Sequence, residues 1–291
     1  ALDTPERRPR GRILQLKEIT PQAVATNSFK MQRLYLRVSS ETLSFAVYHP
    51  FGGKPPVVEN YEVNPTASLN VNLKEALASL PLAQENFSRA EVLLNVPYTL
   101  KPIELFNEEE AEGIYRTCFH NAENDRVFYD VAGNIGTALI YGISDAFCRV
   151  IDDNFQSVHF SSTTTAVANR FAEAARGSKR NTLYAYRHEN LMDMFVFRAG
   201  RLQLGNRFTT IGVEDAAYYV LLAVQTLGMN VDEDEFNIIE PAKADGSLAE
   251  RLRDFVNDVR EEDTKKAFGR SPLAEAENVP YDMAAFLMQP Y

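Results

Sequence analysis

The stretch that decides the fold reads Leu183-Tyr-Ala-Tyr-Arg-His-Glu-Asn-Leu-Met-Asp-Met-Phe-Val-Phe197. Its β-branched and aromatic residues and its alternation predict a pair of strands over residues 182–197. A third strand over residues 202–209 and a long apolar helix over residues 213–227 follow without a gap. This order of elements indicates a fold, because it occurs a second time in the chain.

The earlier copy reads Leu34-Tyr-Leu-Arg-Val-Ser-Ser-Glu-Thr-Leu-Ser-Phe-Ala-Val-Tyr48. It aligns with the later stretch without an insertion, so that Leu34 falls on Leu183 and Val47 on Val196. A strand, a helix and a buried strand follow in both copies, at residues 57–63, 70–80 and 91–96 and again at residues 202–209, 213–227 and 235–239. An internal repeat of this size decides the architecture. We predict an α/β protein with two copies of a β-β-β-α-β-α unit.

The composition agrees with two lobes. With 291 residues and 45% apolar residues the chain can bury a sizeable core. We expect a flexible arm over residues 1–30, a first lobe over residues 31–160, and a second lobe over residues 161–291 whose C-terminal tail packs back. Cys118 and Cys148 lack metal or redox spacing, and we expect both to be buried thiols.

The net charge of −10 argues against a general nucleic-acid surface. No run of about 18 apolar residues exists and no apolar segment follows the N-terminus, so we expect neither a membrane span nor a secretory signal. A cytoplasmic protein is the expectation. The arm holds Arg7, Arg8, Arg10 and Arg12 among prolines; such a tail can touch acidic lipid or RNA, but a solvated arm is the simpler interpretation.

Local signals place two helix starts and one loop. Asn107 and Glu110 form a capping box, and Ser247 with Glu250 forms another, which predicts a helix to about residue 260 with Phe255 facing inward. The glycines of Gly133-Asn-Ile-Gly136 hint at a ligand loop, but a tight hairpin between strands over residues 126–131 and 137–141 explains them.

Two lobes of this type, with Ile211-Gly-Val-Glu-Asp215 opening a helix after the third strand, resemble the actin-like ATPase superfamily. The likeness is closest to its pilus-assembly and cell-division branches. The pattern Phe208-Thr-Thr-x-x-x-Glu-Asp-x-x-Tyr-Tyr219 is also similar to an uncharacterised bacterial family of that fold. The resemblance covers about residues 31–259. It implies two duplicated ribonuclease H-like lobes around a cleft.

Members that hydrolyse ATP carry Asp-x-Gly in the first hairpin of each lobe, where the acid organises the metal and glycine admits the phosphates. The matching positions here are Arg37-Val-Ser39 and Tyr186-Arg-His188. The adenosine loop of the family has a Gly-Gly pair, whereas this chain has Ile238-Ile-Glu-Pro241. The resemblance therefore implies a degenerate, non-hydrolysing homologue.

If the repeat is aligned correctly, Arg37, Ser39, Arg187 and His188 lie near the floor of the cleft. One hypothesis is that they hold an anion or a nucleotide without metal. The alternative is that the arginines are ordinary strand-edge charges and the histidine is structural. Asp193, in the second hairpin, is the single candidate for residual metal chemistry, and we expect no metal site.

Two functions remain open. The first is a scaffold or assembly factor that binds a protein partner or a second copy of itself, with Tyr218, Tyr219 and residues 281–291 as candidate aromatic anchors, and it needs no cofactor. The second is an active ATPase or a nucleotide- or sugar-handling phosphotransferase with altered phosphate loops, which would use ATP and magnesium. No other catalytic motif is present in the sequence.

Overall fold

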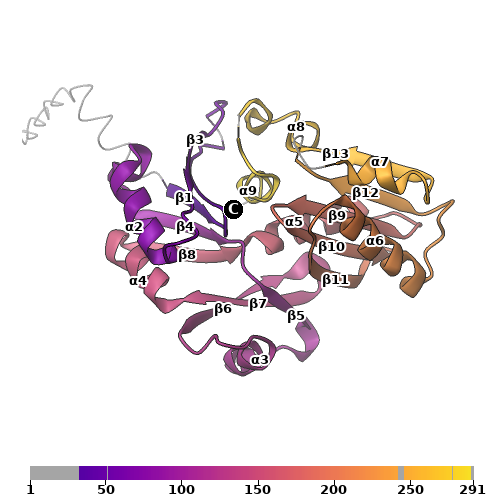
Figure 1. The fold of residues 1–291 in the computed structure, drawn as a ribbon, viewed down its shortest axis with the longest axis horizontal. Coiled ribbons are helices and arrows are strands. Elements are labelled where there is room, and N and C mark those ends of the chain that lie inside the picture. Colours follow the sequence, from indigo (N-terminus) through magenta and orange to yellow (C-terminus); the bar gives the residue numbers. More distant parts are fainter. Residues whose placement is uncertain (1–32, 51, 242–245, 277, 290–291) are drawn as a thin grey trace, which may run out of the picture.

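The computed structural model describes residues 33–50, 52–241, 246–276 and 278–289 (Figure 1). The arm expected over residues 1–30 lies outside the described residues. Among the described helices, none combines the length and the hydropathy needed to cross a membrane.

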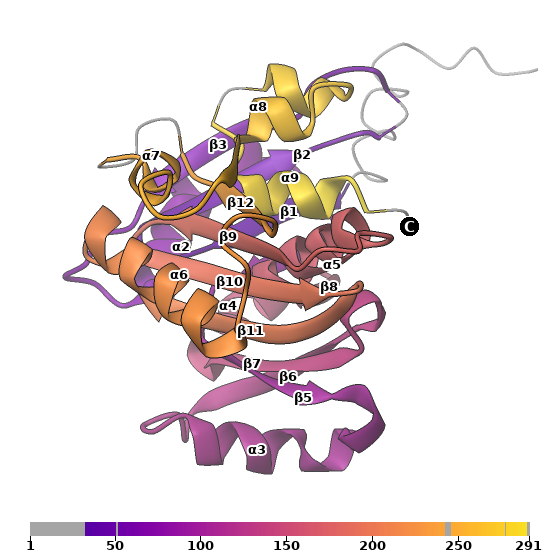
Figure 2. The ribbon, with the colours of Figure 1, turned by 90° about the vertical axis from the view of Figure 1, so that its right-hand side faces the viewer.

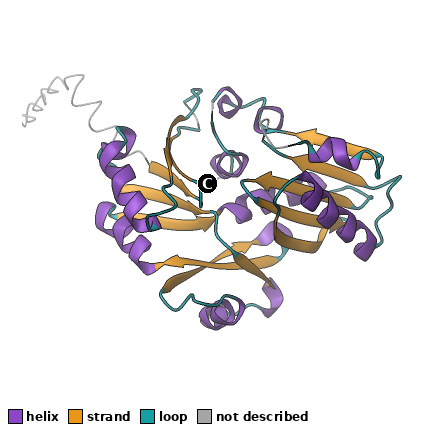
Figure 3. Ribbon diagram, viewed as in Figure 1, coloured by secondary structure: helices purple, strands orange, loops and turns teal. Residues whose placement is uncertain are grey.

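The first lobe is a five-stranded mixed sheet in the order β3-β2-β1-β4-β8 (Figure 3). Its strands are β1 (Arg33–Val38), β2 (Thr42–Val47), β3 (Val57–Glu62), β4 (Arg89–Leu94) and β8 (Ser157–Ser162). Helices α2 (Leu69–Ser79) and α4 (Asp145–Asn154) pack beside it. Leu34, Phe45 and Phe147 lie in one apolar cluster of this lobe.

The second lobe repeats this sheet in the order β11-β10-β9-β12-β13. Its strands are β9 (Thr182–His188), β10 (Leu191–Arg198), β11 (Arg201–Thr209), β12 (Glu235–Ile239) and β13 (Asp258–Glu262), and its helices are α6 (Val213–Leu227) and α7 (Leu248–Leu252). The central strand of each lobe pairs antiparallel with the next strand and parallel with the fourth, as Leu36 with Val92 and Ala185 with Ile238 show. The predicted duplication is confirmed.

A smaller sheet in the order β5-β7-β6 is inserted into the first lobe. It contains β5 (Tyr98–Pro102), β6 (Asp125–Ala132) and β7 (Thr137–Ser144), with α3 (Ala111–Cys118) on one face. Gly136 closes the β6–β7 hairpin with a φ of 64°, which confirms the predicted turn. Gly142 allows close packing of α3, because a Cβ there would lie 2.7 Å from the Tyr115 ring.

Two helices far apart in the sequence lie together between the two main sheets (Figure 2). They are α5 (Thr163–Ala175) and α9 (Tyr281–Leu287). One apolar cluster joins Tyr35 of the first lobe, Phe171 of α5, Tyr184 of the second lobe and Tyr281 of α9. Short helical segments complete the chain: η1 (Leu82–Gln84), η2 (Ile103–Leu105), η3 (Glu108–Glu110), η4 (Gly133–Ile135), α8 (Thr264–Ala267) and η5 (Pro272–Glu275).

Two local predictions were wrong. Ser247 does cap a helix, by accepting from the Glu250 amide at 3.2 Å, but that helix ends at Leu252 and residues 258–262 form β13. Parallel pairing with β12 extends the sheet there, and Phe255 is 45% exposed. Cys118 is exposed because α3 buries only its Ala111 and Tyr115 side, whereas Cys148 is buried as expected.

Candidate functional site

Arg37, the last residue but one of β1, forms a buried ion pair with Asp282 of α9. The Arg37 Nε donates to Asp282 Oδ1 at 2.8 Å and to Oδ2 at 3.0 Å. The two residues are 2% and 0% exposed. Burial by itself lowers the pKa of Arg37, but the Asp282 charge and hydrogen bonds outweigh it and raise that pKa. Arg37 therefore stays charged, and its hydrogen bonds to Asp282 are charge-assisted.

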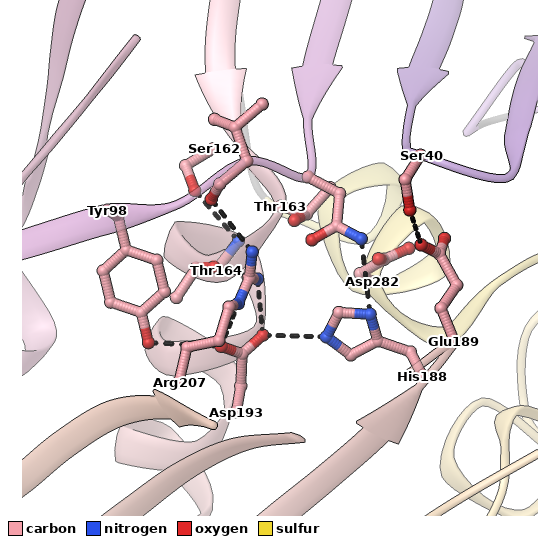
Figure 4. Close-up of polar contacts among 12 residues, drawn as sticks. Ser40, Tyr98, Ser162, Thr163, Thr164, His188, Glu189, Asp193, Arg207 and Asp282 are labelled. Carbon is pink, nitrogen blue, oxygen red and sulfur yellow. Dashed lines mark hydrogen bonds and ion pairs between the residues drawn. The ribbon is translucent and has the colours of Figure 1, made fainter. Parts of the chain in front are cut away.

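The first hairpins of the two lobes touch each other beside this pair. Glu189, at the turn between β9 and β10, accepts from Ser40 Oγ at 2.9 Å and lies 3.5 Å from Arg37 Nη1. Figure 4 shows the Ser40 and Glu189 side chains pointing at one another across the boundary. These hairpins are the places where the resemblance puts the two phosphate loops.

Asp193 of β10 is surrounded by donors. Arg207 of β11 donates to it through Nε and Nη2, each at 2.7 Å, His188 Nε2 lies 3.0 Å away, and Tyr98 OH donates at 3.2 Å (Figure 4). Burial raises the pKa of Asp193, but the charge of Arg207 and these hydrogen bonds outweigh it and lower that pKa well below its usual range. Both carboxylate oxygens are thus already engaged.

A metal site at Asp193 has no support among the described residues, which include no group of three or more His, Cys, Asp or Glu side chains placed to hold an ion. The side chains around the carboxylate are hydrogen-bond donors, and Arg207 among them is a cation. A divalent cation requires the opposite, namely oxygen atoms that donate electron pairs.

Arg207 also ties the two lobes together. Its Nη1 donates to the Val96 carbonyl at 2.9 Å and its Nη2 donates to Thr164 Oγ1 at 3.0 Å, at the start of α5. Sequence reasoning missed this residue. Asp193 and Arg207 are direct partners in the β10–β11 register, where opposite charges attract, but a bulge between Val196 and Phe197 shifts this register by one residue, so the turn alone does not predict the pair.

His188 is held on both ring nitrogens. Besides the Asp193 contact, its Nδ1 lies 3.3 Å from Asn95 Nδ2, and its ring stacks on Tyr186 with centroids 4.6 Å apart. This arrangement is that of a structural histidine that links β9 to the residue after β4. Asn95 Oδ1 is buried and has no partner among the described residues.

The other predicted cleft residues make separate contacts. Arg187 Nη1 donates to Glu240 Oε2 at 2.8 Å and to the Gly246 carbonyl at 3.1 Å. Glu240, in the segment that matches the adenosine loop, also accepts from Ser247 Oγ at 2.9 Å. Ser39 Oγ contacts the Thr42 carbonyl at 3.0 Å within its own hairpin. Arg37 and Arg187 are buried in central strands, so they are not strand-edge charges.

Asp130 of β6 anchors the start of α5. It accepts from Tyr141 OH at 2.7 Å, from the Ser162 amide at 2.8 Å and from Thr165 Oγ1 at 2.6 Å. Burial raises the pKa of Asp130, and the three hydrogen bonds only partly offset this. Two surface hollows, of about 970 and 480 Å³, are lined by other residues than the Arg37 and Asp193 networks.

Two five-stranded sheets with one repeated strand order, joined around a central boundary, define the actin-like ATPase fold. The chain belongs to a family of proteins of unknown function, DUF3822, whose model matches residues 21–259. No match was found among curated proteins.

Solved structures give the same fold. A protein of unknown function with an actin-like ATPase fold, from Bacteroides thetaiotaomicron VPI-5482, is 23% identical, with 91% of this chain and 98% of that chain covered and a TM-score of 0.77. A chain of the PilM-PilN type IV pilus biogenesis complex is 11% identical, with 89% and 98% covered and a TM-score of 0.54. At these identities the likeness is one of fold.

Proposed function

We propose that the protein is a degenerate actin-like ATPase homologue that does not hydrolyse ATP and acts as a protein-binding scaffold or assembly factor. The observation that supports the lack of ATP hydrolysis is the Arg37–Asp282 pair. A carboxylate of the chain's own C-terminal helix is bonded to the cation at the floor of the first lobe.

A nucleotide phosphate bound at Arg37 would have to displace Asp282. The carboxylate would then stay buried without its partner, which costs several kcal/mol on the scale of about 3–5 kcal/mol measured for broken buried pairs. Added phosphate charges next to Glu189 and Asp282 would also repel them. Asp193 does not offset this, because its oxygens are already bonded to Arg207 and His188.

Protein binding is supported by the outer face of α6. Tyr218 is 61% exposed and Leu222, one helical turn on, is 42% exposed. Ile211, just before this helix, is 89% exposed. Neighbouring apolar side chains left in solvent are typical of protein contact surfaces. The similar PilM chain was solved in complex with PilN, which fits a role in assembly.

Hydrolysis is tested by phosphate release from ATP with magnesium. We expect no release above the rate without protein. Turnover that is abolished by Asp193→Asn but kept in the exposed control Glu112→Gln would contradict the proposal. That result would favour the phosphotransferase or ATPase hypothesis.

Protein binding is tested with the double variant Tyr218→Ser/Leu222→Ser. A matched control is Val57→Ser, since Val57 is 58% exposed on β3 of the other lobe. We expect a protein cross-linked to the wild type and to V57S to be lost from the double variant. Equal recovery by all three would contradict a role for the α6 face.

A further inference from the structure

The strand β6 is the open edge of the small sheet. In the order β5-β7-β6, β7 lies on one side of β6 and none of the described strands lies on the other. β6 has eight residues, which is longer than the usual strand of about five or six residues.

The hydrogen-bond pattern shows which backbone groups face that edge. The Asp145 amide donates to the Asn124 carbonyl at 2.9 Å, so this pair belongs to the hydrogen-bonded set of the β6–β7 ladder. Such pairs alternate along an antiparallel ladder. The even-numbered residues of β6 therefore bond to β7, and Val127 and Tyr129 direct their N–H and C=O groups to the open edge. The Asp125 carbonyl fits this pattern, because it accepts from Arg116 Nη2 at 2.9 Å from outside the sheet.

A hollow of about 970 Å³ is lined by the first half of β6, together with residues of η3, of α3 and of the start of α4. It is lined by Arg126 and also by Val127 and Tyr129. Neighbouring residues of a strand point to opposite faces of the sheet. Arg126 therefore points to one face of the sheet and Val127 and Tyr129 to the other. A single hollow that touches side chains of both faces reaches the space beside the strand, where an added strand would lie.

The walls of the hollow are acidic. They carry five acids and two arginines, namely Glu108, Glu112, Glu123, Asp125, Asp145, Arg126 and Arg149. Both arginines already bond to Asp145. The net charge of the lining is therefore negative, which favours a basic segment as the occupant.

The chain itself carries a segment of this chemistry. Residues 10–20 contain three cations, Arg10, Arg12 and Lys17, and one acid, Glu18, and Arg7 and Arg8 come just before them. Residues 10–20 lie between Pro9 and Pro21, are free of proline and include Ile13, Leu14, Leu16 and Ile19. The connection from there to β1 is long enough to cross the first lobe, since an extended residue spans about 3.3–3.6 Å.

We propose that residues 10–20 of the same chain pair with β6 as an added strand, with their cations against the acidic walls. When a strand is added to the edge of a sheet, main-chain hydrogen bonds supply the affinity. The side chains determine which segment binds. This inference does not depend on what the interlobe boundary binds, so the two proposals fail separately.

Residue-resolved amide exchange of the full chain by NMR tests the pairing. The Val127 and Tyr129 amides have no partner on β7, so their protection reports an added strand, whereas the Phe128 amide serves as an internal control. We expect both to exchange at least about tenfold slower than in the variant Arg10→Glu/Arg12→Glu. The control Lys265→Glu/Lys266→Glu makes the same charge change on α8, where both side chains are exposed, and should have no effect.

A charge swap sharpens the test. Glu108→Lys/Glu123→Lys alters two exposed wall residues and should also remove the protection, and combining it with R10E/R12E should restore it. Unprotected Val127 and Tyr129 amides in the wild type, or protection that survives R10E/R12E, would overturn the proposal. Protection that rises with protein concentration would assign the arm to a second copy and overturn the pairing within one chain.

Discussion

Arg37 and Asp282 are 245 residues apart in the chain, yet the guanidinium Nε of one lies 2.8 Å from the carboxylate Oδ1 of the other. The first belongs to the central strand of the first lobe and the second to the C-terminal helix. This helix also packs on α5 and on Tyr186 of the second lobe. The pair therefore fixes three parts of the molecule at the boundary between the two lobes.

Asp282→Asn should destabilise the protein by about 3–5 kcal/mol, because it removes the nearest counter-charge of the buried Arg37 and leaves only the longer contact with Glu189. The change is measured by urea denaturation. Glu112→Gln, in the exposed pair with Arg116, should stay within about 0.5 kcal/mol. The double variant Arg37→Met/Asp282→Leu should cost clearly less than the two single changes added together. A cost for D282N no larger than that for E112Q would contradict a structural role for the pair.

Asp193 should make the protein sensitive to acid. Its pKa in the folded state lies below the unfolded value of about 3.9, so it stabilises the fold above that pH and loses this contribution as the pH falls further. We expect the difference in unfolding free energy between wild type and Asp193→Asn to be largest near neutral pH and to shrink below about pH 4. A difference that stays constant between pH 3 and 7 would contradict an ionised, paired Asp193.

Gly142→Ala should destabilise the small sheet by about 1–3 kcal/mol, because the new methyl group would overlap the Tyr115 ring that α3 packs there. Gly113→Ala, within α3 and facing open space, should instead stabilise by about 0.5–1 kcal/mol. Thermal unfolding of both variants gives the comparison. The same sign for both would show that α3 does not pack as described.

Ser247→Ala should cost about 1–2 kcal/mol, since Ser247 caps α7 and also donates to Glu240. Ser79→Ala, near the exposed end of α2, provides the matched control and should stay within about 0.5 kcal/mol. Equal unfolding midpoints in urea for S247A and S79A would be evidence against the cap.

Much of the fold is predictable from the internal repeat and from local signals at the ends of helices and strands. The helix over residues 213–227 and the strand over residues 235–239 agree with α6 and β12, since apolar spacing, Glu214 and Gly228 mark them locally. The strand β13 was missed because Val256 and Val259 also suit a helix. Pairing of Val259 with Phe236 of β12, a contact between distant segments, decides the outcome.

The site is only half predictable. Alignment of the repeat places Arg37 and His188 near the boundary between the lobes, and each of them contacts a residue of the other lobe, Glu189 and Asn95 respectively. Nothing in the sequence links Arg37 to Asp282, because that contact depends on where α9 packs after a charged connection. Arg207 could not be reached from the turn, because counting back from the turn places Asn206 opposite Asp193, and only the bulge between Val196 and Phe197 brings Arg207 there.

Titration calorimetry of the purified protein with ATP and with ADP, each with and without magnesium, tests the central claim most directly. With Asp282 bonded to Arg37 and Asp193 bonded to Arg207, we predict no binding heat under any of the four conditions, and the same for Asp193→Asn. Micromolar binding that requires magnesium and is lost in Asp193→Asn would contradict the claim and show a working nucleotide site.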